Sequence, residues 1–371
     1  MSRSSTKKKI TAIIVSLIFL VVIAASVFFR IRGLFWGEYL YLHPDERFLI
    51  QVGTNIQSVD SIASYFNTHF STLNPHNRGH GFFVYGDFPI ILTRYITEGF
   101  FEFTGWNEIT QAGRVLSTIF DIGSVILLFF IGKKLFNQWV GLLASIFSGM
   151  AVLQIQQSHF FTVDTFATFF TTLGVYLAVI ISQTDFSEKK YRGGNDESDD
   201  QETPEIQKNW IPSPRTLLLS IFFGIVVGLA AASKINTVTI AILLPLSYFI
   251  LWGRIPISDS GLKSELILRD LVIGGIFAFL SFRIFQPYAF EGPGFFDIQL
   301  NELWLKNLRE VSAQSGGKVD FPPALQWARR NFFFSGKNLS LWGLGLPLSI
   351  TAWFGIFTMG WRILQIGRAH V

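Results

Sequence analysis

Long apolar runs alternate with polar segments along most of the chain. The first run has about 20 residues, enough for a helix to cross a hydrocarbon core of roughly 30 Å. Further runs of the same character follow, so we predict an all-α polytopic membrane protein with about eight transmembrane helices. The expected spans are residues 10–29, 115–131, 139–153, 163–182, 216–232, 237–252, 271–285 and 339–357.

The first run is expected to be an uncleaved anchor. A signal peptide has an apolar core of only about 7–15 residues, followed by small residues at a cleavage site. Here the run is longer and ends in Phe28-Phe29-Arg30. Lys7-Lys8-Lys9 precedes it, so the positive-inside rule places the N-terminus in the cytoplasm.

Residues 30–113 are therefore expected to form a large first external loop. Phe48, Val52 and Ile56 recur in this loop at a four-residue spacing, which predicts a short amphipathic helix. A largely apolar helix is also expected near the end of the loop. The loop would then lie along the membrane surface.

The remaining organisation follows from changes in polarity. Residues 1–290 form one transmembrane module, in which the polar, charge-rich segment 183–214 is expected to be a disordered cytoplasmic loop. Residues 291–338 are a second external segment, and the last span lies within 339–365. Residues 366–371 resemble translated sequencing adapter, so we expect the natural chain to continue beyond a C-terminal truncation.

The amino-acid composition agrees with a membrane protein and argues against cysteine chemistry and a nucleic-acid partner. Only 15% of the residues are charged, whereas a soluble globular chain usually has about 25%. The chain has no cysteine, which excludes disulfides, thiolate metal sites and thiol catalysis. The net charge of +4 is modest, and no basic helix or aromatic-interleaved patch indicates a nucleic-acid partner.

A concentrated group of polar residues follows the first span, where the membrane ends and water begins. The segment contains His43, Pro44, Asp45, Glu46 and Arg47 in succession. Pro44 fixes its own φ and restricts His43 to extended conformations, so a stiff turn presents Asp45. We interpret the two carboxylates as a reactive centre. Capping of an interfacial helix is the structural alternative, since acids favour helix N-termini.

Further ionisable residues fall at the external ends of the expected spans. Such groups cost about 2.5–3.5 kcal/mol inside the hydrocarbon, and they usually mark a functional cavity. We expect the following residues to share an external site with the acidic pair: Arg114, His159, Asp164, Lys234 and Arg283. His159 and Asp164 also suit a turn and a helix cap, and Arg283 also suits contact with lipid headgroups.

These groups favour transfer of a sugar from a lipid-phosphate carrier. A carboxylate can take a proton from an attacking hydroxyl or amine, and cations can hold the phosphate. A transporter or flippase for a lipid-linked sugar is the alternative, and it predicts ionisable groups near the middle of the bilayer. Asp121 lies two turns from Arg114 on one helix face, so we expect these two to form an intramembrane ion pair.

Several sequence blocks resemble the GT-C superfamily of polyprenyl-phosphate-dependent glycosyltransferases. The resemblance is to the branch of the protein mannosyltransferases and lipid A aminoarabinose transferases, and it extends from residue 10 to about residue 290. The blocks, in order, are Asp45-Glu46 after the first span, Gly113-Arg114-Val115-Leu116-Ser117 with Asp121, Gln157-Ser158-His159-Phe160, Val163-Asp164-Thr165, and Gly228-Leu229-Ala230 with Ser233-Lys234.

The resemblance implies a GT-C-like bundle and an inverting glycosyltransferase of the cell membrane with an extracytoplasmic active site. Asp45 would be the catalytic base, and Glu46 would orient it or the acceptor. The resemblance further implies a polyprenyl-phosphate sugar donor, a protein, lipid or glycan acceptor, and contact with membrane lipids. Substrate and phosphate contacts would come from His43, Arg47, Arg114, Lys234 and Arg283.

The cofactor and the donor sugar are less well defined by the resemblance. A divalent metal held by the acidic pair with His159 and Asp164 is the one candidate cofactor. Tyr85-Gly86-Asp87-Phe88-Pro89 stands where aminoarabinose transferases carry a Lys-Pro-Pro element. The missing lysine puts an aminoarabinose donor in doubt.

Overall fold

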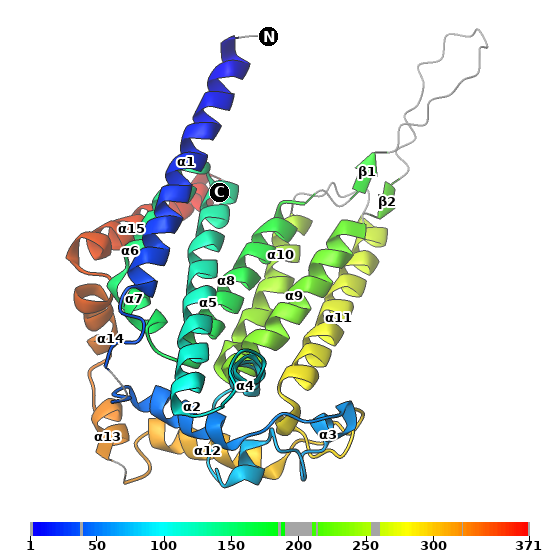
Figure 1. Ribbon diagram of the computed structural model, residues 1–371. Coiled ribbons are helices and arrows are strands. Elements are labelled where there is room, and N and C mark those ends of the chain that lie inside the picture. Colours follow the sequence, from blue (N-terminus) through cyan, green and yellow to red (C-terminus); the bar gives the residue numbers. More distant parts are fainter. Residues whose placement is uncertain are drawn as a thin grey trace.

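The computed structural model of the protein is almost entirely helical (Figure 1). It describes residues 3–37, 40–184, 187–189, 210–212, 214–253, 260–320 and 322–369. Long helices run alongside one another and form a bundle, with α1 at its edge. These helices are α1 (Arg3–Ile31), α5 (Trp106–Leu135), α8 (Val163–Ser182), α9 (Pro214–Ser233), η2 (Ile235–Ile242) with α10 (Leu243–Trp252), and α11 (Ser260–Phe285).

The described residues contain five helices that are long and apolar enough to cross a membrane. A sixth is counted if α6 (Gln138–Met150) and α7 (Val152–Ser158), which are bent by 59° where they meet, form one span. The predicted membrane bundle is confirmed, but the predicted count of eight spans is not.

Two of the expected spans differ from their predicted form. α11 is a long helix, but it carries Arg269, Asp270 and Arg283 along its apolar stretch. The expected last span is interrupted, because residues Leu339–Gly343 form the separate turn η5 and α15 (Leu346–Ala369) begins only after Gly345. Gly345 has a φ of +78°, a conformation that favours glycine and ends the preceding helical turn.

Short helices gather at the end of the bundle opposite the N-terminus (Figure 1). Most of them come from the predicted first external loop, and the others follow α11. They are α2 (Pro44–Asn55), α3 (Ile62–Phe66), η1 (Pro75–Arg78), α4 (Asp87–Phe100), η4 (Pro287–Ala289), α12 (Glu302–Ser315) and α13 (Pro322–Ala328). The short α14 (Phe334–Asn338) follows them. We call the elements of residues 40–100 the loop layer.

The opposite end of the bundle carries a short antiparallel pair of strands, β1 (Ser187–Lys189) and β2 (Trp210–Pro212). The expected disordered loop, 183–214, otherwise lies almost wholly outside the described residues. The two ends of the bundle therefore differ, and all the candidate site residues come from the end that carries the loop layer.

An apolar cluster fastens the loop layer to the bundle. The predicted amphipathic helix is α2, and its buried side chains pack against residues from α4, α5 and α8. A Cβ on Gly53 would lie 3.0 Å from Ile109 of α5, so α2 approaches α5 closely. The fully or almost fully buried members of the cluster include Leu49, Ile50, Val52, Ile56, Ile90, Ile109, Phe161 and Phe166.

Candidate functional site

The acidic pair begins α2. His43 caps the helix, with its Nδ1 accepting a hydrogen bond from the Glu46 backbone N–H at 3.4 Å, and Pro44 occupies the first helical turn. Proline suits this position, because the first N–H groups of a helix have no intrahelical partner. Asp45 and Glu46 therefore face the positive end of the helix dipole. The capping side chain is therefore that of His43, and the two acids lie within the first turn of the helix.

Glu46 points inward and is fully buried. Arg114 of α5 binds both of its oxygens, with distances of 2.7 Å from Nε to Oε1 and 2.8 Å from Nη2 to Oε2. The Phe161 backbone N–H also donates to Oε1 at 2.8 Å. The remaining Arg114 nitrogen, Nη1, donates to the carbonyls of Leu34 and Trp36. Glu46 and Arg114 thus tie the start of α2 to the bundle.

Asp45 is half-buried and lies close to the Tyr85 hydroxyl. Burial raises the pKa of the Tyr85 hydroxyl well above its usual value. The nearby negative charges of Asp45 and Asp164 raise this pKa further. The Asp45 and Asp164 carboxylates therefore both lie in the neighbourhood of Tyr85.

Asp164, in the first turn of α8, pairs with Lys234 at the end of α9. The distance from Lys234 Nζ to Asp164 Oδ1 is 2.5 Å, and the two side chains are 41% and 37% exposed. Two ionic side chains from different spans thus meet at the end of the bundle that carries the loop layer. Their exposure leaves them accessible to a ligand, unlike Glu46 and Arg114.

The segment containing Tyr85 is docked on the end of α9. The Gly86 N–H donates to the Ser233 carbonyl at 3.2 Å, one residue before Lys234. A Cβ on Gly86 would lie only 1.8 Å from the Ala232 carbonyl oxygen, so only glycine permits this approach. The contact brings the Tyr85–Asp45 group and the Asp164–Lys234 pair together.

The other predicted site residues lie apart from this group or are bound to the backbone. The exposed Arg47 donates to the Tyr41 carbonyl at 3.3 Å. The two ring nitrogens of His159 lie 2.7 Å from the Ile155 carbonyl and 3.1 Å from the Arg32 carbonyl.

Arg283 is fully buried and organises the segment that follows α11. It donates to the Gly294 carbonyl at 2.6 Å and to the Phe295 carbonyl at 3.0 Å. Its guanidinium also lies over the rings of Phe66 and Phe290, 4.9 and 4.7 Å from their centres. Aromatic faces attract a cation at such distances, so this arginine stabilises a loop.

The predicted ion pair between Arg114 and Asp121 is wrong. Asp121 instead pairs with Arg30 of α1, with 2.5 Å between Nε and Oδ2 and both side chains almost fully buried. Arg114 is unavailable because Glu46 binds it. The spacing within α5 correctly predicts that both residues share a helix face, but it does not identify the partner on the neighbouring helix.

Two further residues of the site have no assigned role in the sequence analysis. Tyr85 lies close to Asp45, and Asp87 is a buried acid at the start of α4. Burial raises the pKa of Asp87 to about 8, while the Tyr288 N–H donates to its Oδ2 and has the opposite effect. The only sequence signal for both is the Tyr-Gly-Asp run that opens a helix, with glycine where two backbones meet.

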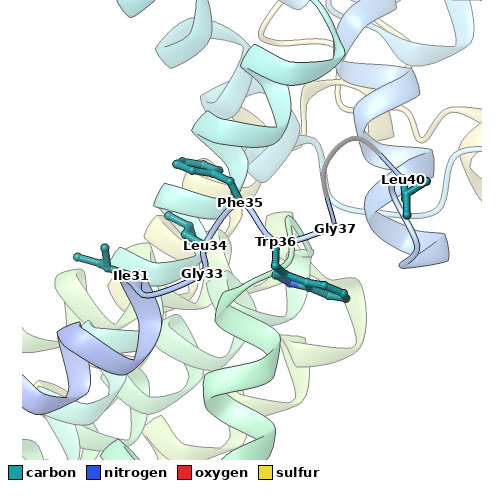
Figure 2. A pocket seen from close by; sticks show the side chains of 7 residues that line it. All are labelled: Ile31, Gly33, Leu34, Phe35, Trp36, Gly37 and Leu40. Atoms are coloured by element: carbon teal, nitrogen blue, oxygen red, sulfur yellow. The ribbon is translucent and has the colours of Figure 1, made fainter.

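Two hollows lie beside the segment that follows the C-terminal end of α1. Figure 2 shows the larger one, about 590 Å³, lined by Ile31, Gly33, Leu34, Phe35, Trp36, Gly37 and Leu40. The second, of about 220 Å³, shares Phe35 and Trp36 and is otherwise lined by Tyr41, Asn107, Thr110, Gln111 and Arg114. Asp45 lines neither hollow. We therefore define the candidate site by the ionic side chains that lie near one another, and not by a cavity.

A metal site of the usual kind is not formed by the described part of the chain. There, no group of three or more His, Asp or Glu side chains is placed to hold an ion. The predicted association of His159 with the acidic residues is also not seen, since both of its ring nitrogens face backbone carbonyls. Asp45 and Asp164 are the two carboxylates that share a neighbour, Tyr85.

The architecture has a counterpart among solved structures. The chain is similar to the crystal structure of the Archaeoglobus fulgidus oligosaccharyltransferase in the apo form, with a TM-score of 0.51 and 14% identity over 88% of this chain and 36% of that one. That enzyme has a GT-C fold, so the helical bundle of this chain is GT-C-like. The chain spans about a third of the length of this structural relative.

Residues 88–191 match the family model of the dolichyl-phosphate-mannose-protein mannosyltransferases. The predicted resemblance to the GT-C superfamily is thereby confirmed. The protein is an integral membrane protein of this fold class. A search of curated proteins finds no match.

Two further structures of the archaeal enzyme are also similar. One is tethered to an acceptor peptide containing the NVT sequon, with a TM-score of 0.48, 13% identity, and coverage of 95% of this chain and 38% of that one. The other is a complex with Zn and sulfate, with the same TM-score and identity, and coverage of 94% and 40%.

Proposed function

We propose that the protein transfers a sugar from a polyprenyl-phosphate carrier to an acceptor, with Asp45 as the general base. The observation that carries this proposal is the placement of Asp45 beside Tyr85, next to the Asp164–Lys234 pair, at one end of a GT-C bundle. The family matched by residues 88–191 is named for dolichyl-phosphate-mannose, which is itself a polyprenyl-phosphate sugar.

The reaction follows from the chemistry of these groups. Asp45 accepts the proton of the acceptor hydroxyl or amine as the acceptor attacks the anomeric carbon of the sugar. The bond from that carbon to the phosphate oxygen breaks, and polyprenyl phosphate leaves with the electron pair. A single displacement inverts the anomeric configuration. Nearby carboxylates also stabilise the positive charge that develops on the sugar ring.

The cations near Asp45 differ in how well they suit phosphate binding. Lys234 is 41% exposed and is paired with the partly exposed Asp164, so it is our main phosphate ligand. Arg114 and Arg283 are buried and bound to Glu46 and to carbonyls. We propose that these two arginines fix the structure around the site: Arg114 holds the start of α2, and Arg283 holds the segment that follows α11. His43 holds the start of α2, and the exposed Arg47 is a second cation for an anionic ligand.

Asp45 and Asp164 would hold a divalent cation if the enzyme uses one. An ion of the Mg²⁺ type can be held by one or two protein carboxylates, because it keeps several waters and takes further ligands from substrate phosphate. Such an ion would neutralise charge on the phosphate when bound. The Lys234 ammonium already supplies positive charge at Asp164.

The proposed orientation follows from the basic N-terminus. Lys7–Lys9 in the cytoplasm would place the loop layer, at the opposite end of α1, in the extracytoplasmic water layer. A reporter inserted near residue 60, within the loop layer, tests this directly. Its detection on the cytoplasmic side would overturn the orientation.

The activity is tested by incubating the purified protein with a panel of labelled polyprenyl-phosphate sugars. Release of polyprenyl phosphate by the wild type, and its loss in a folded Asp45→Asn variant, are the expected results. An Asp45→Asn variant as active as the wild type would show that Asp45 is not the general base. Movement of the labelled lipid across liposomes without any glycosidic bond formed would favour the alternative, a flippase for lipid-linked sugars.

A further inference from the structure

The smaller of the two hollows has one aromatic wall and one polar wall. The aromatic wall comes from the segment that follows α1, and the polar wall comes from the first turns of α5. The lining residues are Phe35, Trp36 and Tyr41 on one side and Asn107, Thr110, Gln111 and Arg114 on the other. The α5 positions are spaced by three or four residues, so they share one helix face.

The size of this hollow limits what it can hold. Its volume of about 220 Å³ is smaller than the roughly 300–1,000 Å³ of pockets that enclose drug-sized ligands. The hollow therefore suits one ring-sized unit and not a whole peptide or oligosaccharide.

The aromatic wall is fixed by side chains of the polar wall. Nη1 of Arg114 donates to the carbonyls of Leu34 and Trp36, at 2.9 and 3.2 Å. The Tyr41 hydroxyl donates to Asn107 Oδ1 at 2.6 Å. Tyr41 also has a φ of +46°, a left-handed conformation that is rare for a bulky residue. Residues held in such conformations cluster at ligand sites.

The polar wall has hydrogen-bonding capacity left for a ligand. Because Asn107 Oδ1 accepts from Tyr41, Nδ2 provides two N–H donors, which have no partner among the described residues. The Gln111 amide has no hydrogen-bond partner among them either. The Thr110 hydroxyl donates to the Trp106 carbonyl at 2.6 Å and can still accept through its lone pairs. The wall therefore presents neutral donors and acceptors.

The charge of the hollow favours a neutral ligand. Arg114 is the only charged residue in its described lining, and Glu46 already binds this arginine. A phosphate would find no uncompensated cation there. The aromatic wall can instead cover an apolar ring face, while the amides bind hydroxyl groups. A neutral sugar ring combines these two properties.

We propose that this hollow binds a neutral sugar unit of the acceptor, so that the protein extends a saccharide. The inference rests on the proposed function, because it names the acceptor of the same transfer reaction. The acceptor hydroxyl oxygen bonds to the anomeric carbon of the donor sugar, and its proton passes to Asp45. The bond from that carbon to the phosphate oxygen breaks, and polyprenyl phosphate leaves with the electron pair.

The position of the hollow fits an acceptor better than a donor. Arg114 binds Glu46, the residue next to Asp45, so the hollow lies beside the start of α2. Lys234, our main phosphate ligand, pairs with Asp164 at the ends of α9 and α8. Neither of these helices contributes a described residue to the hollow. Separate places suit an inverting transfer, in which the acceptor attacks the face of the sugar opposite the leaving phosphate.

A labelling experiment without turnover locates the sugar. The purified full chain is irradiated with a diazirine-bearing methyl mannobioside, and labelled peptides are identified by mass spectrometry. We expect label on peptides that contain Trp36, Tyr41 or Gln111, and we expect excess methyl mannobioside to compete with it. Label only elsewhere on the chain would overturn the inference. Label in the hollow that a serine-containing peptide displaces, and the free saccharide does not, would also overturn it.

A substitution in the polar wall tests the role of the hollow in transfer. Gln111→Leu removes one amide with little change in volume, and Gln51→Leu, at an exposed position of α2, is the matched control. We expect Gln111→Leu to reduce the labelling and to raise KM for methyl mannobioside by roughly 3- to 10-fold, the worth of one neutral hydrogen bond. KM for polyprenyl-phosphate mannose should change by less than about twofold, and Gln51→Leu should behave as wild type.

The outcomes separate this inference from the proposed function. A rise in KM for the donor, with no change for the acceptor, would place the donor sugar in the hollow and overturn the acceptor assignment. Unchanged labelling and KM values in Gln111→Leu, with Asp45→Asn inactive, would overturn the inference and leave the proposed function intact. An active Asp45→Asn variant would overturn the proposed function, whereas competed label in the hollow of that variant would still support sugar binding there.

Discussion

Arg114 binds both carboxylate oxygens of Glu46, with Nε and Nη2 at 2.7 and 2.8 Å. A bidentate arginine–carboxylate pair has fixed geometry, so it sets the rotation of α2 about its own axis. With Glu46 directed toward α5, the adjacent Asp45 must point elsewhere, and it meets Tyr85. The two neighbouring acids therefore differ in environment: Glu46 anchors the helix to α5, and Asp45 stays half-buried near Tyr85.

Replacing Glu46 by alanine should destabilise the protein strongly. The substitution leaves the buried Arg114 without its counterion, and breaking a buried pair in this way costs about 3–5 kcal/mol. Asp45→Asn should cost far less, since Asp45 is half-buried and its replacement can still accept a hydrogen bond. Thermal unfolding in detergent, followed by circular dichroism, measures both. A Glu46→Ala protein as stable as Asp45→Asn would contradict the anchoring role.

Lys234→Met should weaken donor binding with little loss of stability. The Lys234–Asp164 pair is partly exposed, and exposed pairs contribute only about 0.2–1 kcal/mol to stability. Loss of a charge-assisted contact to phosphate should raise KM for a polyprenyl-phosphate sugar by roughly 10-fold. The matched control is Lys306→Met, which removes an exposed lysine from α12. Equal KM values in the two variants would show that Lys234 does not bind the donor phosphate.

The one-sided placement of the ionic groups was predictable from sequence. Alternating spans put Asp45, Asp164 and Lys234 at the same end of the bundle, and the four-residue spacing after the acidic pair predicts α2. The hydrophobic pattern and the alternating direction of the spans are sufficient to predict which end of the bundle a residue occupies, because that depends only on where each helix begins and ends. The GT-C fold was predicted differently, from the resemblance of several sequence blocks to that superfamily.

The pairing of side chains was not predictable to the same degree. Spacing within α5 places Arg114 and Asp121 on one face, yet they bind Glu46 and Arg30 on different helices. A single helix contains no information on which neighbour faces it at each turn. The position of Tyr85 was missed for a related reason, since it depends on the backbone contact between Gly86 and the end of α9.

Removal of either partner from the Arg30–Asp121 pair should destabilise the attachment of α1. Arg30 also donates to the Gly149 carbonyl at 2.9 Å, so an Asp121→Leu variant leaves a buried cation with incomplete compensation. We expect a loss of about 3–5 kcal/mol for Asp121→Leu and a partial recovery in the double variant Arg30→Met with Asp121→Leu. Thermal midpoints of the single and double variants measure this coupling. No recovery in the double variant would contradict a simple buried pair.

The buried Asp87 should make stability fall as pH rises. Its pKa is about 8 in the folded protein, whereas an unfolded aspartate has a pKa of about 4. Between these values the folded state keeps a proton that the unfolded state has lost, so this contribution is complete below about pH 4 and is lost by about pH 8. The slope is at most about 1.4 kcal/mol per pH unit.

Asp87→Asn should remove this slope, because the amide stays neutral and can still accept the Tyr288 N–H. The variant should therefore gain stability over wild type near pH 8 and lose that advantage as the pH falls toward 4. Thermal midpoints measured across this range provide the comparison, with Asp60→Asn as the control for an exposed carboxylate. Parallel pH profiles for wild type and Asp87→Asn would show that Asp87 is already ionised in the folded protein.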